Sequence, residues 1–111
     1  ARDDPRIKAC LKWIRNHYTL ETNPNMPGRQ SAEGLYYYFY VFAKARDAWG
    51  DPILIDARGR PHNWRRELCH KIMSLQKSDG SWVNASPRWL EGDANYVTGL
   101  TILTLQTALR E

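Results

Sequence analysis

The stretch Gln76-Lys77-Ser78-Asp79-Gly80-Ser81-Trp82 decides the predicted fold, because it ends one helix pattern and leads into another. Before it, the segment from about Asn63 to Gln76 is amphipathic, with one apolar stripe of Trp64, Leu68, Ile72 and Leu75. After it, the segment from about Asn95 to Leu109 has two apolar faces and is expected to be mostly buried. These faces carry Tyr96, Leu100 and Leu103 on one side and Ile102, Leu105 and Leu109 on the other. The two segments predict a helical hairpin.

A similar pair of helices is predicted earlier in the chain. Asp4 and Pro5 are typical of a helix start, a capping residue followed by proline in the first turn. The apolar stripe of this first helix would be Ile7, Cys10, Leu11, Ile14 and Tyr18. A second helix is expected from near Ser31 to Trp49, closed by Gly50, and its first half is aromatic or apolar on every side. The segment 53–60 is expected to form a short hairpin or an extended loop.

The two pairs look like copies of one unit. Sliding the chain by 59 residues superposes Cys10 on Cys69 and Tyr37 on Tyr96. The order is amphipathic, buried, amphipathic, buried. We therefore predict an all-α chain, a single domain or fragment over residues 1–111, with one repeat at about 4–50 and the other at about 62–110. Amphipathic helices would form an outer layer, and the buried helices an inner wall facing a cavity.

The motif Lys71-Ile72-Met73-Ser74-Leu75-Gln76-Lys77-Ser78-Asp79-Gly80-Ser81-Trp82 resembles the QW repeat of squalene–hopene cyclases and the related repeats of protein prenyltransferases. The segment from Asn95 to Leu105 resembles the inner helix that follows such repeats. The first repeat lacks the Gln and Trp but keeps Gly28 and the aromatic helix. The resemblance covers most of the chain and implies an α/α toroid. Since repeat units cannot bury their faces alone, we expect a fragment of a longer protein, self-association, or a compact four-helix unit.

The resemblance also implies roles for individual residues. Gln76, Gly80 and Trp82 would be structural, with the Gln binding backbone groups at the start of a neighbouring helix and the Trp covering a helix end. The residues expected to line a hydrophobic cavity are Tyr36, Tyr37, Tyr40, Tyr96 and Thr98. Their rings would hold a polyisoprenoid and steady a carbocation, each contributing ~0.5–2 kcal/mol. The alternative is that the rings only fill space between helix layers.

Catalysis has little support in the sequence. The Asp-x-Asp-Asp acid motif of the cyclases is absent, and a helix cap explains Asp3-Asp4 better. Cys69 and His70 point about 100° apart on one helix and cannot easily share the zinc ion of the prenyltransferases. No metal, cofactor or catalytic residue is therefore assigned. Glu91 and Asp93 could form the paired carboxylates of a carbohydrate-active toroid, although capping of the last helix by Asp93 is the favoured interpretation.

Composition limits the partners. Hydrophobic residues make up 42% of the 111 residues, enough for a core, and Lys plus Arg exceed Asp plus Glu by 16 to 12. An Arg-rich cluster around His62 lacks a recognition motif, so no nucleic-acid partner is expected. The two cysteines are expected to be free thiols, and the histidines to be ordinary residues without partners. No apolar run is long enough for a transmembrane segment. Nothing indicates a compartment.

Three functions remain open. The first is part of a terpenoid-cyclase-like protein that contributes a cavity for an isoprenoid or similar lipid, without catalysis by the isolated chain. The second is a non-enzymatic repeat module for protein–protein or lipid contacts. The third is a carbohydrate-active toroid using Glu91 and Asp93. The expected partners are thus a hydrophobic ligand, further copies of the chain, or the remainder of a longer one.

Overall fold

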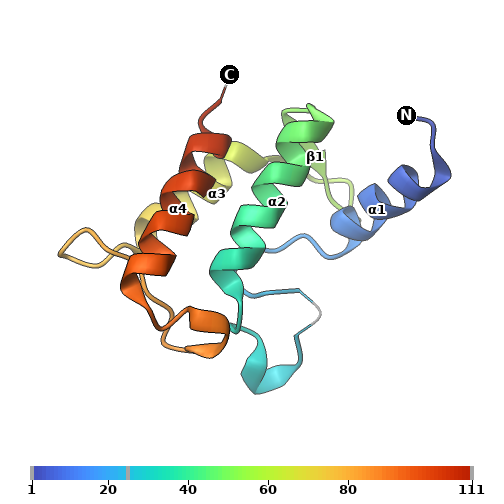
Figure 1. The fold of residues 1–111 in the computed structure, drawn as a ribbon. Coiled ribbons are helices and arrows are strands. Elements are labelled where there is room, and N and C mark those ends of the chain that lie inside the picture. The colour runs from blue at the N-terminus through green and yellow to red at the C-terminus, as the bar shows by residue number, and fades with distance from the viewer. Residues whose placement is uncertain (1, 25, 111) are drawn as a thin grey trace.

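The computed structural model describes residues 2–24 and 26–110, which form a mostly helical fold with one small sheet (Figure 1). The elements in chain order are α1 (Pro5–Asn16), η1 (Gly28–Gln30), α2 (Leu35–Trp49), β1 (Ile53–Ile55), β2 (Pro61–Asn63), α3 (Trp64–Leu75), η2 (Arg88–Leu90) and α4 (Ala94–Ala108). Both η segments are single 3₁₀ turns. The four longer helices occur where the sequence predicts them.

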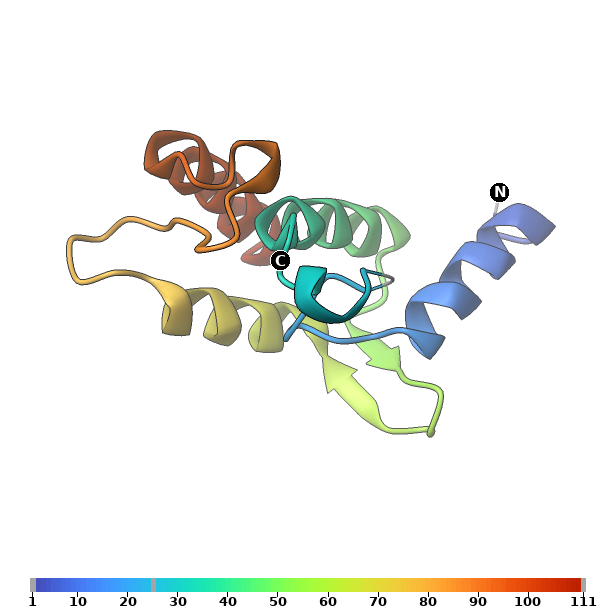
Figure 2. The ribbon, with the colours of Figure 1, turned by 90° about the horizontal axis from the view of Figure 1, so that it is seen from below.

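The helices lie in two layers. Helices α2 and α4 run side by side in the same direction, and α3 lies behind them in the second layer (Figures 1 and 2). The buried residues between the layers include large side chains from α2, α3 and α4, among them Phe39, Trp64, Leu68, Ile72 and Val97. The core is therefore built mainly by α2, α3 and α4, and Leu20, Leu54 and Trp82 add to it from other segments.

The helical fold class is confirmed in part, because the structure also contains a small sheet. The hairpin that was one of two alternatives for residues 53–60 is present and extends to Asn63. Strands β1 and β2 pair antiparallel, with Leu54 opposite His62. Asp56 closes the turn, because its carboxylate accepts hydrogen bonds from the backbone N–H groups of Arg58 and Arg60 at 2.9 and 3.0 Å. Gly59 has a φ of +78°, which a glycine adopts without steric cost.

Helix α2 begins at Leu35, later than the predicted start near Ser31. Gly34 has a left-handed φ of +69° and separates the preceding turn from the helix. The first free N–H groups of the helix, on Tyr36 and Tyr37, bind the side chain of Glu91, a residue far along the chain. The helix ends as predicted at Gly50, also left-handed. A tertiary contact, rather than a local cap, sets the start.

Helix α1 lies at the edge of the molecule, away from α3 and α4 (Figure 1). Its predicted cap is confirmed, since Asp4 accepts a 2.8 Å hydrogen bond from the Arg6 N–H. Its apolar stripe is not buried, and within Pro5–Asn16 no residue reaches the buried class. The facing flank of α2 contributes Ala45, Ala48 and Trp49 to an apolar cleft of about 310 Å³ between the two helices.

Helix α4 buries a different face from the predicted one. The buried residues are Val97, Thr101, Thr104, Thr107 and Ala108. The larger Ile102, Leu103 and Leu109 are about half exposed or more. Small side chains let α4 approach α2 closely, and the Thr104 and Thr107 hydroxyls donate to carbonyls one turn earlier, at 2.9 and 3.1 Å. The apolar side chains are thereby left on the outer surface.

Candidate functional site

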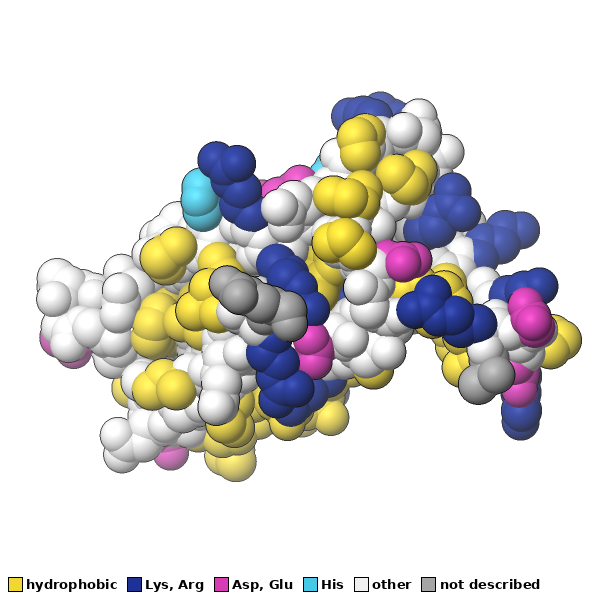
Figure 3. Space-filling model, turned by 90° about the horizontal axis from the view of Figure 1, so that it is seen from above, with side chains coloured by type: hydrophobic (Ala, Val, Ile, Leu, Met, Phe, Trp, Pro, Cys, Tyr) yellow, Lys and Arg dark blue, Asp and Glu magenta, His cyan; other side chains and the backbone are white. Residues whose placement is uncertain are grey.

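The layer formed by α2 and α4 carries an exposed apolar face. Its exposed large side chains are Tyr37, Val41, Tyr96, Ile102, Leu103 and Leu109. Figure 3, which looks onto the C-terminal ends of α2 and α4, shows hydrophobic side chains (yellow) along this edge at the bottom of the view. Large apolar side chains that gather on one layer mark a binding site or an interface more often than scattered single residues do.

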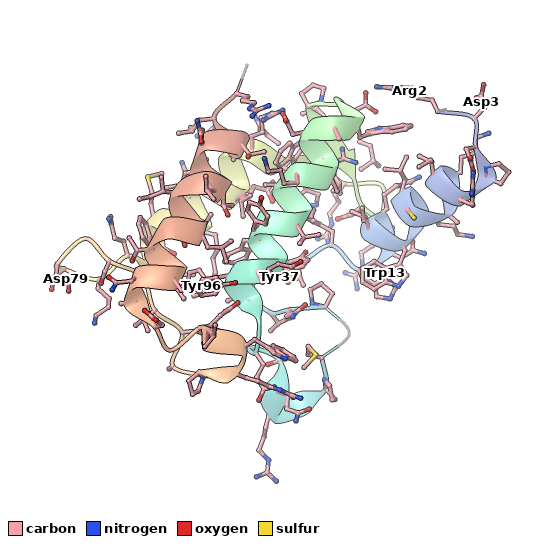
Figure 4. The ribbon with its side chains drawn as sticks, viewed as in Figure 1. Arg2, Asp3, Trp13, Tyr37, Asp79 and Tyr96 are labelled. Atoms are coloured by element: carbon pink, nitrogen blue, oxygen red, sulfur yellow. The ribbon has the colours of Figure 1, made fainter. Side chains whose placement is uncertain are left out.

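At the N-terminal ends of the two helices this face opens into an aromatic cleft of about 460 Å³, lined by Asn23, Gly34, Tyr37, Trp89 and Tyr96. Figure 4 shows Tyr37 and Tyr96 at matching positions near the starts of α2 and α4. The cleft is thus framed by an aromatic ring from each helix and by Trp89 from the loop before α4. We refer to it below as the aromatic cleft.

Trp89 is held in the aromatic cleft by an unusual backbone. Its φ is +58° and that of Leu90 is +68°, so two consecutive residues with side chains lie in the left-handed region. Such conformations cost of order 1–3 kcal/mol each and are concentrated at functional sites. Gly34 makes room for the indole, because a Cβ there would lie 3.1 Å from Trp89 ring carbons. The Arg88 guanidinium lies over the same ring, 4.3 Å from its centroid.

The loop that carries Trp89 is fixed by Glu91. Its side chain is fully buried and accepts hydrogen bonds from the N–H groups of Tyr36 and Tyr37, at 3.1 and 2.9 Å. Asn84 Nδ2 donates to the same carboxylate at 3.0 Å. A carboxylate at this position also complements the positive end of the α2 dipole. Glu91 therefore fastens the loop 84–91 to the first turn of α2, beside Tyr37.

The same contacts test the third function, in which Glu91 and Asp93 would act as the paired carboxylates of a carbohydrate-active toroid. Glu91 offers no exposed oxygen to a substrate, because it is buried and occupied by three donors. Asp93 caps α4 as predicted and accepts from the N–H groups of Asn95 and Tyr96 at 2.9 and 3.3 Å. These two acids have structural roles and do not support carbohydrate cleavage.

The five residues predicted to line a cavity do not all lie together in the structure. Tyr37 and Tyr96 line the aromatic cleft, and the Tyr40 ring lies beside Tyr37 with centroids 6.5 Å apart. Tyr36 is buried against Phe39 in an edge-on contact, and burial raises the pKa of its hydroxyl. Thr98 accepts a 3.0 Å hydrogen bond from the Trp82 N–H and so belongs to the loop packing. The sequence does not predict a role for Trp89, because this residue lies outside the periodic patterns of the helices.

The glutamine–tryptophan motif lies at the junction of α3 and α4. Trp82 is buried, and its Nε1 donates to the Ile72 carbonyl at 2.9 Å. Gln76 differs from the role that the resemblance implies, since its amide donates at 2.8 Å to the carbonyl of Gly80 within its own turn. In this chain it is Glu91 instead that accepts hydrogen bonds from the first backbone N–H groups of another helix, α2. The turn before Trp82 needs no long-range partner because Gly80, at φ +90°, closes it locally.

A second polar cluster corrects the expectation that His62 has no partner. Its Nε2 lies 2.8 Å from Asp56 Oδ2 and its Nδ1 lies 3.0 Å from Glu67 Oε1. The Tyr18 hydroxyl donates to the same Glu67 oxygen at 2.8 Å. Burial opposes charge on His62, but the hydrogen bonds to Asp56 and Glu67 outweigh it and raise the pKa of the imidazole. The bond from His62 keeps the pKa of Asp56 well below its usual range.

The aromatic cleft is suited to binding rather than to proton transfer. The polar side-chain groups of its lining are one amide, two phenol hydroxyls and one indole N–H, and no carboxylate or imidazole lines it within residues 2–24 and 26–110. In the same described residues, no group of three or more His, Cys, Asp or Glu is placed to hold a metal ion. Both cysteines are free thiols, as predicted, Cys10 exposed and Cys69 buried.

Comparison with known proteins identifies no relative: no family model, no curated protein and no solved structure matches this chain. Over the described part of the chain, none of the helices combines the length and hydrophobicity needed to cross a bilayer. The function must therefore be inferred from the residues and their arrangement.

Proposed function

We propose that this chain is part of a terpenoid-cyclase-like protein, in which the aromatic cleft contributes to a cavity for an isoprenoid or another apolar ligand. The observation that carries the proposal is the placement of Trp89 in one cleft with Tyr37 and Tyr96, through a backbone with two left-handed residues, Trp89 and Leu90. Rings that only filled the core would be buried. Trp89 and Tyr37 are instead 53% and 56% exposed.

The arrangement of the helices supports the same proposal. In an α/α toroid the inner helices run parallel and an outer helix connects each to the next, as α3 connects α2 to α4 here. Helix α3 covers one side of α2 and α4 (Figure 2). The exposed apolar side chains of α2 and α4 would face the cavity of such a toroid. Further hairpins would complete the cavity wall.

We propose a binding role, without catalysis by this chain alone. Protonation of an alkene needs an acid in contact with the ligand. The pair Asp3-Asp4 lies at the start of α1, where Asp4 is engaged as the helix cap. Glu91, the acid behind the cleft, is occupied by backbone donors. An apolar ligand would gain roughly 25 cal/mol for each Å² of apolar surface it buries against the rings.

Farnesol binding tests the proposal. Titration of the chain with farnesol should change tryptophan fluorescence saturably, and the Trp89→Ala/Tyr96→Ala double variant should bind about tenfold more weakly or worse, because it loses two apolar surfaces. Trp13→Ala is the matched control, since Trp13 is also exposed but lies on α1, away from the cleft (Figure 4). Equal affinity in both variants would exclude the aromatic cleft as the binding site.

A second candidate, a repeat module that associates with copies of itself, is favoured by the outer flank of α4. Ile102 and Leu109 are 56% and 68% exposed there, on a helix that buries threonines. The expected result is a concentration-dependent mass in light scattering that Ile102→Lys abolishes. A monomer at all concentrations would remove this candidate and leave the ligand-binding proposal in place.

A further inference from the structure

A buried arginine near the C-terminal end of α2 lacks a charged partner. Arg46 is 4% exposed, and among the described residues its Nε has no hydrogen-bond partner. Its Nη2 makes one long contact, 3.4 Å to the carbonyl oxygen of Ile53. Burial lowers the pKa of Arg46, yet a guanidinium stays protonated in proteins. A buried charge is costly unless it is paired, so an anion bound beside the Arg46 guanidinium would offset that cost.

The acid whose charge acts on Arg46, Asp51, is engaged elsewhere. Asp51 accepts a 2.7 Å hydrogen bond from the Trp49 indole and lies 3.9 Å from the Arg2 guanidinium. No carboxylate within the described chain comes within ion-pair distance of Arg46. The protein thus places Asp51 close enough to act on Arg46 through space, but does not pair the two.

Arg46 lines a cleft of about 320 Å³ between α1, α2 and β1. Its other lining residues are Leu11, Arg15, Trp49, Asp51, Ile53, Leu54 and Ile55. Arg15 is held at this cleft from the opposite side, because its Nε donates to the Ile55 carbonyl at 2.7 Å. The walls are mainly aliphatic and aromatic, and the two guanidinium groups are their cationic features.

The approach to this cleft is basic. An adjoining hollow of about 610 Å³ shares Leu11, Arg15 and Trp49 with it and adds Lys8 and Lys12. Figure 3 shows Lys and Arg side chains (dark blue) collected at the right, over α1 and its surroundings. Such a field raises the local concentration of anions and speeds their association.

We propose that this cleft binds the carboxylate of a small amphipathic acid, with the carboxylate on Arg46 and Arg15 and the apolar body against Leu11, Trp49 and Leu54. The cleft is separate from the aromatic cleft and shares no lining residue with it. Asp51 selects for a single negative charge, because it would repel a phosphate dianion more strongly than a carboxylate. The apolar walls favour an acid with a hydrocarbon body over a free inorganic ion.

Octanoate, octanol and inorganic phosphate test this assignment on the intact chain. Octanoate should raise the melting temperature and shift the Arg46 Hε–Nε resonance in a saturable manner, whereas octanol and phosphate should do neither. Arg46→Met should weaken octanoate binding about tenfold to a hundredfold, as expected for loss of a charged hydrogen-bond donor. Arg15→Gln should weaken it less. Arg66→Gln, an exposed arginine on α3, is the control and should bind as the parent does.

The Arg46→Met chain should be at least as stable as the parent without ligand, since an unpaired buried charge is replaced by an apolar side chain. If that variant does not fold, the Arg46 resonance in the parent and the Arg15→Gln affinity decide the question. An equal response to octanol and octanoate would show that the cleft binds apolar molecules without a carboxylate site. A stronger response to phosphate than to octanoate would show that an amphipathic carboxylic acid is the wrong class of ligand. No response of Arg46 to octanoate would refute the proposal.

Discussion

The indole nitrogen of Trp82 donates a 2.9 Å hydrogen bond to the carbonyl oxygen of Ile72, joining the loop before α4 to the last turns of α3. Ile72 is fully buried, and its carbonyl lies near the end of the helix, where backbone acceptors lack partners within the helix. The N–H of Trp82 donates in turn to Thr98 on α4. One residue therefore closes the α3–α4 hairpin through its backbone, its ring and its ring nitrogen.

Trp82→Ala should lower the free energy of unfolding by about 3–5 kcal/mol, because it leaves a cavity and an unpaired carbonyl. Trp82→Phe keeps most of the ring volume and should cost less, near the ~1 kcal/mol of one hydrogen bond plus imperfect packing. Urea denaturation measures both. If the two variants lose the same stability, ring packing at this junction is not what holds the hairpin.

Glu91 makes a comparable connection between α2 and the loop 84–91. Glu91→Ala should cost about 3 kcal/mol, because several buried donors lose their acceptor at once. Asp93→Ala, two residues away, removes an exposed helix cap and should cost about 1 kcal/mol. The comparison uses urea denaturation of both variants. Similar losses would show that the buried carboxylate contributes no more than an ordinary cap.

The pair Glu91 and Asp93 also shows what the sequence could predict. The capping role of Asp93 was predicted, because a cap is a local pattern of residues before a helix. The role of Glu91 was not, because its partners, Tyr36 and Tyr37, are 55 and 54 residues distant. Local periodicity thus predicted all four helices, and the contacts that fix the aromatic cleft are long-range.

The same distinction explains the errors in burial. Periodicity identifies which residues of α4 share a face but does not say which face meets a neighbour. Thr101 and Thr104 are buried because small side chains allow the close approach of α2, whereas Leu103 is exposed. Arg46 and Trp89 could not be found in this way, since a buried charge and a left-handed tryptophan depend on tertiary placement.

The His62 cluster should make stability depend on pH. In the folded state the pKa of His62 is raised, so its stabilising contribution is complete below the unfolded value of about 6.5 and is lost as the pH rises through the folded value. The pKa of Asp56 is lowered, so its contribution is present above about 3.9 and is lost as the pH falls through its folded value. The cluster therefore stabilises the fold most between these limits.

His62→Gln isolates the histidine contribution. The stability difference between parent and variant should be larger at about pH 5.5 than at about pH 8.5, because only the charged imidazole bridges Asp56 and Glu67. Urea denaturation at both pH values measures it. A difference that is constant over this range would show that the hydrogen bonds do not depend on the charge.

The contact between Gly34 and Trp89 can be tested against a glycine with the same backbone and no neighbour. Gly34→Ala places a Cβ 3.1 Å from the Trp89 ring, while Gly59→Ala, at φ +78°, meets nothing within 4 Å. Both substitutions carry a left-handed cost of about 1–2 kcal/mol, so the excess loss at Gly34 reports the clash. We expect that excess to shrink when Trp89 is also replaced by alanine. It should not vanish, because Asn23 Nδ2 lies 3.2 Å from the same Cβ position.

Thermal or urea unfolding of the two single glycine variants, Trp89→Ala and the Gly34→Ala/Trp89→Ala double variant gives the coupling directly. Strict additivity in this cycle would place the Trp89 indole away from Gly34 in solution and remove the ring from the aromatic cleft.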